Sequence, residues 1–271
     1  MPELPEVETV TQSVKKHLMG KQFRSLDVNW QKTLHNFTIS DFDSSIKNKV
    51  IKNVYRRAKY ILFDLGEVLM GVHLRMTGKL YVVDSIDRSK KHISLYLAFG
   101  DKYLVFEDTR KFGRFYMFDG IDYLNSKLGI EPLTKDFSKN WILENTKKRN
   151  RQIKSLLLDQ SFICGIGNIY ADEALWYARI HPLSISSQIS GKKILKLHEG
   201  IVKVLSESIK KGGTTIRDYT YDFAYVGNYA LNLNVFGKQG KNCARCEGLI
   251  FKTKVAQRGT HYCPKCQVKI S

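Results

Sequence analysis

Long apolar runs are absent from this sequence, and none approaches the ~20 residues that a membrane-spanning helix needs. The first residues are acidic instead of apolar, so we expect no secretory signal, a cytoplasmic location and no membrane partner. Acidic residues are also scarce, with 26 against 44 lysines and arginines, and the net charge is +18. Such a charge repels itself unless an anionic partner offsets it. Nucleic acid is the expected partner, and an anionic membrane surface is the alternative. The basic residues are scattered among aromatic ones instead of forming one amphipathic helix, which favours nucleic acid.

Cysteine is scarce as well, and its placement is uneven. Four of the five cysteines form two Cys-x2-Cys pairs, Cys243 with Cys246 and Cys263 with Cys266, separated by 16 residues. This spacing predicts a zinc ribbon, in which two thiolate turns hold one tetrahedral Zn²⁺. Disulfides are the alternative, which an intracellular chain disfavours. Because thiolates fill all four positions, the zinc is expected to be structural and to stabilise a segment with little core of its own.

Between the cysteine pairs the sequence predicts a hairpin. We expect its strands at residues 249–256 and 259–263 and its turn at Gln257-Arg258-Gly259. An arginine at a hairpin tip suits insertion into a DNA minor groove. The alternative is a turn arginine that contacts only water.

Residues 141–182 form a second informative block. Helical patterns cover 141–148, 152–159 and 169–179, and a glycine-containing turn at 160–168 separates the last two. Asn168 is a suitable N-cap, and the backbone amides at such a helix start bind phosphate well. Residues 147–151 add four positive charges in five positions. A tight helix–helix turn and a solvated basic face are the alternatives, but the two features together favour binding of a DNA backbone.

The chain begins Met1-Pro2-Glu3. Removal of Met1 would leave Pro2 with a secondary amine that is partly unprotonated near neutral pH, because an α-amino group has a pKa of about 7.7–8. Such an amine can attack an electrophilic carbon, and Glu3 could move protons at the reacting centre. The alternative is ordinary helix-start chemistry, in which proline and glutamate occupy a first turn.

Six motifs in order give the chain an end-to-end resemblance to the bacterial formamidopyrimidine-DNA glycosylases, which excise oxidised purines. The zinc ribbon is the last of them. The other five are PELPEVETV at 2–10, RRAKY at 56–60, HLRMTG at 73–78, DTRKFG at 108–113 and GIGNIY at 165–170.

The resemblance implies an α+β multidomain fold. It predicts an N-terminal catalytic β-sandwich with flanking helices at 1–133, a helical helix-two-turn-helix domain at 134–236 and a four-cysteine zinc finger at 237–271. The sequence agrees coarsely, with a helical pattern at 9–19, strand-like alternation over 50–120 and helical patterns over 136–211. The implied partner is duplex DNA that contains a damaged base, and we expect a monomer associated with the nucleoid.

The resemblance also implies roles for individual residues. Pro2 would attack the sugar carbon that bears the damaged base, Glu3 would protonate the sugar oxygen, and Lys59 would contact phosphate and donate a proton during β-elimination. Arg258 would lie near the phosphate that flanks the lesion and assist the second elimination. The damaged nucleotide must leave the stack, so other residues fill the gap or hold phosphates. The gap-filling residues would be Met76, Arg110 and Phe112, and the phosphate-binding residues would be His92, Arg151 and Asn168.

Without the resemblance, several of these residues have other interpretations. Met76 and Phe112 would be core residues, Lys59 a surface cation and His92 a hydrogen-bonded strand histidine. Two runner-up functions also stay open. One is an oxidised-pyrimidine glycosylase that resembles endonuclease VIII, although Leu4 stands where that branch favours glycine. The other is a DNA-damage-binding protein without catalysis.

The sequence departs from the family pattern at two places. Ala58 stands where the lysine motif usually has glycine, which is tolerable unless the backbone there needs a positive φ. Residues 219–229 alternate aromatic side chains where the family has a more polar loop that covers the extruded base. This stretch is either a strand with one aromatic face or an aromatic lid that stacks on the base.

Overall fold

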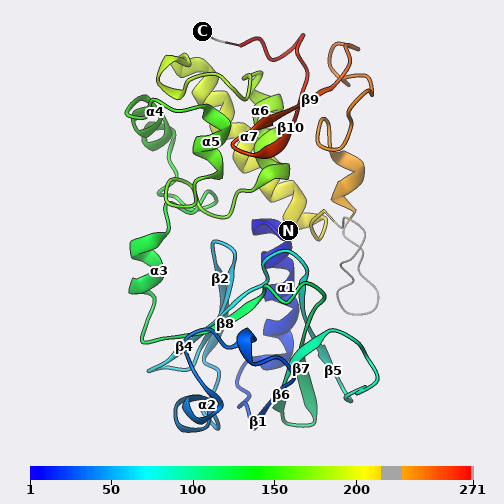
Figure 1. Cartoon of the computed structure of the whole chain (residues 1–271). Coiled ribbons are helices and arrows are strands. Elements are labelled where there is room, and N and C mark those ends of the chain that lie inside the picture. The colour runs from blue at the N-terminus through cyan, green and yellow to red at the C-terminus, as the bar shows by residue number, and fades with distance from the viewer. Residues whose placement is uncertain (215–227, 270–271) are drawn as a thin grey trace. The chain divides into compact units, whose positions relative to one another are not determined.

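The computed structural model describes residues 1–214 and 228–269, which form two compact units (Figure 1). The first unit contains residues 1–126 together with 212–214, and the second contains residues 127–211 and 228–269. Most of the aromatic stretch at 219–229 lies outside the described residues, so the choice between strand and lid stays open. Within the described part, no helix is long and apolar enough to cross a membrane.

The first unit is a β-sandwich. Its strands are β1 (Ser25–Val28), β2 (Asn53–Arg57), β3 (Tyr60–Asp64), β4 (Leu69–His73), β5 (Gly78–Val83), β6 (Ile93–Phe99), β7 (Lys102–Asp108) and β8 (Arg114–Phe118). They form two four-stranded sheets with the orders β1-β6-β7-β5 and β2-β3-β4-β8, and all pairings are antiparallel. Apolar side chains of both sheets meet in one buried core, which includes Phe63, Val72, Leu97 and Phe106. The strand-like alternation predicted for residues 50–120 is confirmed.

Helix α1 (Leu4–Leu18) packs into the same core. Val7, Val10, Val14 and Leu18 recur at helical spacing and are fully buried, so this face of the helix is apolar. The helix begins five residues earlier than the predicted start at residue 9. A capping box that joins the side chain and backbone of residues 3 and 6 satisfies the amides of the first turn and extends the helix toward the N-terminus. Two short helices, α2 (Ile39–Ser45) and α3 (Asp122–Lys127), follow later in the chain.

The second unit is mainly helical. Its helices are α4 (Lys139–Lys147), α5 (Ile153–Leu158), α6 (Asn168–Ala178) and α7 (Gly191–Lys210). The three helices predicted at 141–148, 152–159 and 169–179 are therefore confirmed within two residues at each end. Helices α6 and α7 cross closely at Gly200, where an added Cβ would lie 2.8 Å from the Tyr177 side chain.

The C-terminal hairpin pairs β9 (Phe251–Val255) with β10 (Arg258–Tyr262), as predicted, but its turn is shifted. Val255 pairs with Arg258, and the two turn residues Ala256 and Gln257 have φ values of 49° and 59°. Such a two-residue turn with positive φ at both positions matches the right-handed twist of the strands. The predicted turn at 257–259 was therefore wrong by one residue, and Arg258 opens the second strand.

In Figure 1 the zinc hairpin lies beside α6, which contacts β10. Two buried carboxylates of α6 hold the hairpin and the segment that leads into it. Asp172 accepts a 2.8 Å hydrogen bond from the backbone N–H of His261 in β10. Glu173 accepts from the backbone N–H groups of Asn234, Val235 and Phe236, which lead into the hairpin. The hairpin and the helices consequently belong to one compact unit.

Candidate active site and nucleic-acid interface

The residues that follow exposed Met1 are buried and held by a carboxylate. Pro2, Glu3 and Glu6 are all buried, with Glu3 only 3% exposed. Glu6 accepts a 2.9 Å bond from the backbone N–H of Glu3 through Oε2 and a 2.7 Å bond from the N–H of Thr214 through Oε1. Gly213 has φ +86°, and an added Cβ would lie 3.0 Å from Glu6 Oε1, so glycine permits this close approach. The Pro2–Glu3 segment is therefore held in one place before any substrate binds.

Lys59 lies in the two-residue turn between β2 and β3, and only 6% of it is exposed. The interpretation as a surface cation was therefore wrong. Arg56 fixes the turn, because its Nε donates to Glu8 of α1 at 2.8 Å and its Nη1 donates to the Ala58 carbonyl at 3.1 Å. Ala58 has φ 52°, which is the left-handed conformation that favours glycine. The backbone thus needs a positive φ where the sequence has an alanine.

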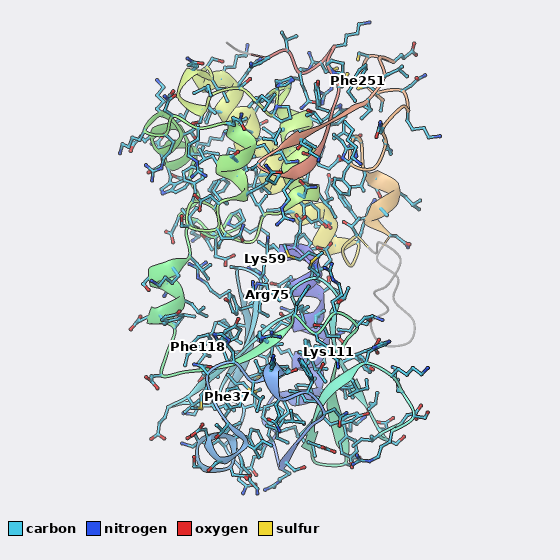
Figure 2. The ribbon with its side chains drawn as sticks, viewed as in Figure 1. Phe37, Lys59, Arg75, Lys111, Phe118 and Phe251 are labelled. Atoms are coloured by element: carbon cyan, nitrogen blue, oxygen red, sulfur yellow. The ribbon has the colours of Figure 1, made fainter. Side chains whose placement is uncertain are left out.

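An uncharged histidine lies close to two cations beside this turn. Burial is the main cause that lowers the pKa of His73 to about 3, and the charges of Arg75 and Lys59 lower it further. Its Nδ1 accepts a 3.0 Å bond from the Arg75 backbone N–H, and the Tyr60 ring packs edge-on against it at 4.7 Å. Burial also raises the pKa of Tyr60 to about 12. The histidine is therefore uncharged at neutral pH, and the cations whose charges act on it are Lys59 and Arg75. Figure 2 labels both cations.

The three side chains predicted to fill a gap in DNA come together on two exposed loops. Met76 is 40% exposed and Phe112 is 47% exposed, so their interpretation as core residues was wrong. Nη1 of Arg110 lies 3.0 Å from the Met76 sulfur, and its Cζ lies 4.9 Å from the centre of the Phe112 ring. A thioether, a guanidinium and an aromatic ring thus form one exposed cluster, which we call the wedge.

Two of the predicted phosphate-binding residues are exposed. His92 precedes β6, has φ 69° and is not part of a strand, so the strand-histidine interpretation was wrong. Arg151 precedes α5, and its Nη1 forms an ion pair with Asp159 at 2.7 Å. Both side chains are accessible to a ligand.

The third, Asn168, is placed differently from the prediction. Gly167 is the N-cap of α6, and Asn168 is the first residue of the helix, so its assignment as N-cap was wrong. Its Nδ2 donates to the Gly259 carbonyl at 2.8 Å, while its buried Oδ1 finds no hydrogen-bond partner among the described residues. The amide therefore reaches the hairpin strand that begins with exposed Arg258.

A buried ion pair in the helical unit also holds strand β10. Nζ of Lys154 lies 2.6 Å from Asp172, and both side chains are fully buried. The same Nζ donates to Thr260 Oγ1 at 2.7 Å. Because Asp172 also binds the backbone of His261, this pair fixes the position of the strand beside Arg258.

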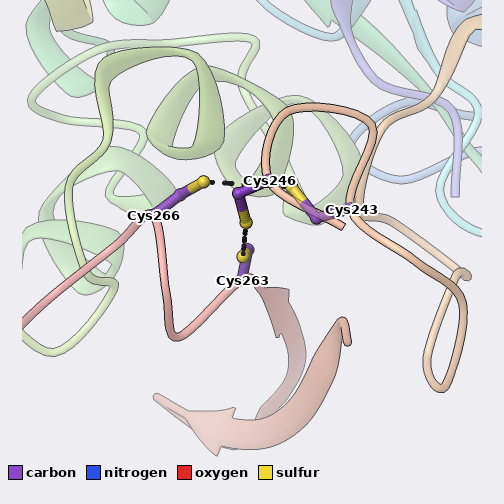
Figure 3. Close-up of side chains that lie close together, drawn as sticks. All are labelled: Cys243, Cys246, Cys263 and Cys266. Atoms are coloured by element: carbon purple, nitrogen blue, oxygen red, sulfur yellow. Dashed lines mark hydrogen bonds between the residues drawn. The ribbon is translucent and has the colours of Figure 1, made fainter. Parts of the chain in front are cut away.

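The four cysteine thiols form a metal site (Figure 3). All four Sγ atoms lie within 4.8 Å of one another, as ligands of a single tetrahedral ion do. The indole N–H of Trp176 in α6 donates to Cys243 Sγ at 3.3 Å, and the Gln267 side chain accepts from the Cys263 backbone N–H at 2.8 Å. These neighbours orient the thiolates, and the predicted zinc site is confirmed.

The predicted residues are divided between the two units. The first unit carries Pro2, Glu3, Lys59, Met76, His92, Arg110 and Phe112, and the second carries Arg151, Asn168, Arg258 and the four cysteines.

Sequence reasoning missed three groups that hold functional residues in place. They are Asp108, whose carboxylate accepts from the loops of the wedge, the Lys154–Asp172 pair beside Arg258, and Trp176 beside Cys243. Asp108 is part of a quoted motif, but no local pattern shows that it is buried. The partners of Lys154 are 18 and 106 residues away, and no spacing rule connects them.

A β-sandwich with a buried acidic N-terminus, a helical unit and a four-thiolate zinc hairpin defines a class of DNA glycosylases. Family models match three parts of the chain, the "Formamidopyrimidine-DNA glycosylase N-terminal domain" at residues 1–115, its "H2TH domain" at 128–220, and the "Zinc finger found in FPG and IleRS" at 240–268. The chain belongs to the formamidopyrimidine-DNA glycosylase family, whose enzymes combine glycosylase and lyase activities.

Individual relatives match over their full length. The formamidopyrimidine-DNA glycosylase of Protochlamydia amoebophila is 44% identical over 277 residues, which covers 99% of this chain and all of the relative. That of Herpetosiphon aurantiacus is 41% identical over 98% of this chain and all of the relative. Among solved structures, a Lactococcus lactis FPG mutant in complex with Fapy-dG DNA has a TM-score of 0.93 at 37% identity, covering 99% of this chain and all of that one. A MutM complex with DNA containing carbocyclic 8-oxo-G has a TM-score of 0.92 at the same identity and coverage.

Proposed function

We propose that the chain removes oxidised purines, 8-oxoguanine and formamidopyrimidines, from duplex DNA through the N-terminal proline and then cleaves the strand by β,δ-elimination. The observation that carries the residue assignment is the buried start of the chain, where Glu6 holds the backbone beside Pro2. The full-length similarity to structures bound to Fapy-dG and 8-oxo-G DNA supports the choice of lesion.

The chemistry begins once Met1 is removed and the secondary amine of Pro2 is free. The amine attacks C1′ of the damaged nucleotide, the C1′–N bond breaks, and the base leaves with the bonding electrons and takes up a proton. Glu3 gives a proton to the sugar ring oxygen as the ring opens and an iminium forms between Pro2 and C1′.

Strand cleavage follows because the iminium makes the C2′ protons acidic. Loss of one of them expels the 3′ phosphate, and a second elimination expels the 5′ phosphate. Lys59 donates a proton in the first elimination, and Arg258 binds the flanking phosphate in the second. The low exposure of Lys59 supports its proposed contact with phosphate, since the electrostatic attraction between a cation and an anion is stronger away from bulk water.

DNA binding by this enzyme uses both a wedge and phosphate contacts. Met76, Arg110 and Phe112 fill the space that the extruded nucleotide leaves, and their exposure and mutual contacts suit insertion into a base stack. His92, Arg151 and Asn168 hold phosphates of the backbone.

The division into domains at 1–133, 134–236 and 237–271 and the cytoplasmic, nucleoid-associated location are part of the same proposal. The three family models cover residues 1–115, 128–220 and 240–268, so each begins within six residues of a proposed domain start, which supports the division. Limited proteolysis that cuts near residues 133 and 236 would agree with it.

Borohydride trapping tests the proposal. The full chain is incubated with a duplex that contains one 8-oxoguanine opposite cytosine, reduced, digested and analysed by mass spectrometry. We expect a covalent adduct on Pro2. The Pro2→Gly variant has a primary instead of a secondary terminal amine and should react far more slowly yet bind DNA, whereas the matched Pro5→Gly variant keeps the secondary amine and should keep the adduct.

Other outcomes point to the runner-up functions. An adduct that forms only with an oxidised pyrimidine would assign the chain to the endonuclease VIII-like branch. Tight binding without an adduct on any lesion or abasic site would indicate a binding protein without catalysis.

A further inference from the structure

Asp108, at the end of β7, is fully buried and binds groups from three loops. Its Oδ1 accepts a 2.5 Å bond from Thr77 Oγ1 and a 3.2 Å bond from the Arg110 backbone N–H. Its Oδ2 accepts a 2.7 Å bond from the Gly113 N–H. Its own N–H donates to the His92 carbonyl at 2.9 Å. One side chain and its backbone thus join the segments that contain Thr77, His92 and Arg110.

These three segments carry the wedge and one of the proposed phosphate contacts. Met76 directly precedes Thr77, and Arg110 and Phe112 lie between Asp108 and Gly113. Each segment also contains a non-glycine residue in the left-handed conformation, since φ is 55° at Arg75, 57° at Lys111 and 69° at His92. Side chains disfavour this conformation, so neighbouring bonds must hold it.

We propose that Asp108 is the positioning residue of the DNA wedge: it holds the Met76 loop and the Arg110–Phe112 loop in register with each other and with His92. This inference rests on the proposed role of the wedge. Asp108 itself is buried and does not reach DNA, so it acts through the loops that it fixes.

Both carboxylate oxygens are needed for this task. Oδ1 accepts from Thr77 in one loop and from the Arg110 N–H in the other, and Oδ2 accepts from the Gly113 N–H at the far end of the second loop, so the carboxylate acts here as an acceptor only. Asparagine would replace one acceptor by an NH₂ group, which cannot accept from Thr77 or from the Gly113 N–H. Thr77 adds a second link, because its Oγ1 also accepts from the Arg110 N–H at 3.2 Å.

Four substitutions in the full chain test the proposal. Asp108→Asn removes one acceptor, Thr77→Val removes the hydroxyl and keeps the shape, and Thr77→Ser keeps the hydroxyl. Thr11→Val is the matched control, because it removes a buried hydroxyl bonded to the Val7 carbonyl of α1 at 2.7 Å, outside these loops.

The readout is the ratio of two single-turnover cleavage rates, for an abasic site in duplex DNA and for the same site in single-stranded DNA. Only the duplex needs its stack opened and filled. We expect Asp108→Asn and Thr77→Val to lower the ratio about tenfold, the effect of one hydrogen bond to a charged group. Thr77→Ser and Thr11→Val should keep the wild-type ratio. A fluorescent 2-aminopurine opposite the site should report reduced insertion in the same two variants.

Met76→Ala separates failure of this inference from failure of the wedge assignment. If Met76→Ala lowers the ratio and neither Asp108→Asn nor Thr77→Val does, Asp108 has only a structural role and the inference is overturned. If Met76→Ala leaves the ratio unchanged, the wedge assignment itself fails, and the inference fails with it. If the Asp108→Asn variant does not fold, the rate ratio of the Thr77→Val variant decides whether the inference holds.

Discussion

Replacing Ala58 by glycine is the sharpest stability test that this structure offers. Ala58 is the first residue of the tight turn between β2 and β3, its φ is 52°, and it directly precedes Lys59. Glycine adopts this conformation without a steric penalty, whereas a residue with a Cβ does not. Ala58→Gly should therefore remove strain that the native chain carries beside a proposed catalytic residue.

The magnitude follows from three opposing contributions. Relief of left-handed strain should stabilise the fold by about 1–2 kcal/mol. The greater chain entropy of glycine costs about 0.5–1 kcal/mol, and loss of the buried methyl costs about 0.8 kcal/mol. We therefore expect Ala58→Gly to change the free energy of unfolding by less than about 1 kcal/mol in either direction.

Ala98→Gly is the matched control in the same unit. Ala98 lies in β6 with ordinary extended geometry, so its replacement incurs the entropy cost and part of the methyl cost without any relief of strain. It should destabilise the sandwich by about 0.5–2 kcal/mol. The difference between the two variants isolates the strain at Ala58, about 1–2 kcal/mol.

Native-state hydrogen exchange is the appropriate assay, because the chain has two compact units and need not unfold in one step. Amides of β3 and β4 report the opening of the sandwich alone. If Ala58→Gly lowered the exchange protection of the β3 and β4 amides as much as Ala98→Gly does, Ala58 would carry no strain in its left-handed conformation. That result would refute the reasoning.

Four further predictions concern other parts of the molecule. Removal of zinc by a chelator should abolish exchange protection of β9 and β10 and leave that of β3 and β4 unchanged, because metal binding supplies the folding energy of the hairpin. His73 has a folded pKa of about 3 against 6.5, so the unfolded chain takes up the proton first. The contribution of neutral His73 to the free energy of unfolding is complete above pH 6.5 and falls by ~1.4 kcal/mol per pH unit as the pH drops toward 3. The His73→Gln variant should therefore show a flatter dependence of unfolding free energy on pH in this range, measured by acid unfolding. Lys154→Met leaves Asp172 as an unpaired buried charge and should cost about 3–5 kcal/mol in thermal unfolding, which Lys154→Met with Asp172→Asn should largely recover. DNA affinity should fall steeply between roughly 50 and 200 mM salt, because phosphate contacts release counterions, and a flat titration would contradict the proposed interface.

Local spacing in the sequence was sufficient for much of the site. The two Cys-x2-Cys pairs predicted the zinc centre because ligand spacing within a tight turn is a short-range property. Helical periodicity placed α4, α5 and α6 within two residues, and alternation over residues 50–120 indicated strands there without giving their individual bounds, since burial of one face imposes such periodicity. The N-terminal Pro2-Glu3 pair and the order of the motifs indicated the family.

Tertiary structure decided the rest, because it depends on contacts between residues that are distant in the chain. No local pattern shows that Met76 and Phe112 are exposed while Lys59 is buried, or that Ala58 needs a positive φ. The Asn168 side chain donates to the carbonyl of Gly259, 91 residues away in the hairpin, and Gly167 instead of Asn168 is the N-cap of α6. Asp108 joins three loops only because β5 and β7 pair at Gly78 and Asp108. The sequence by itself thus determined which chemical groups and which local elements the protein has. Only long-range packing decided where those groups lie and which of them hold the others in place.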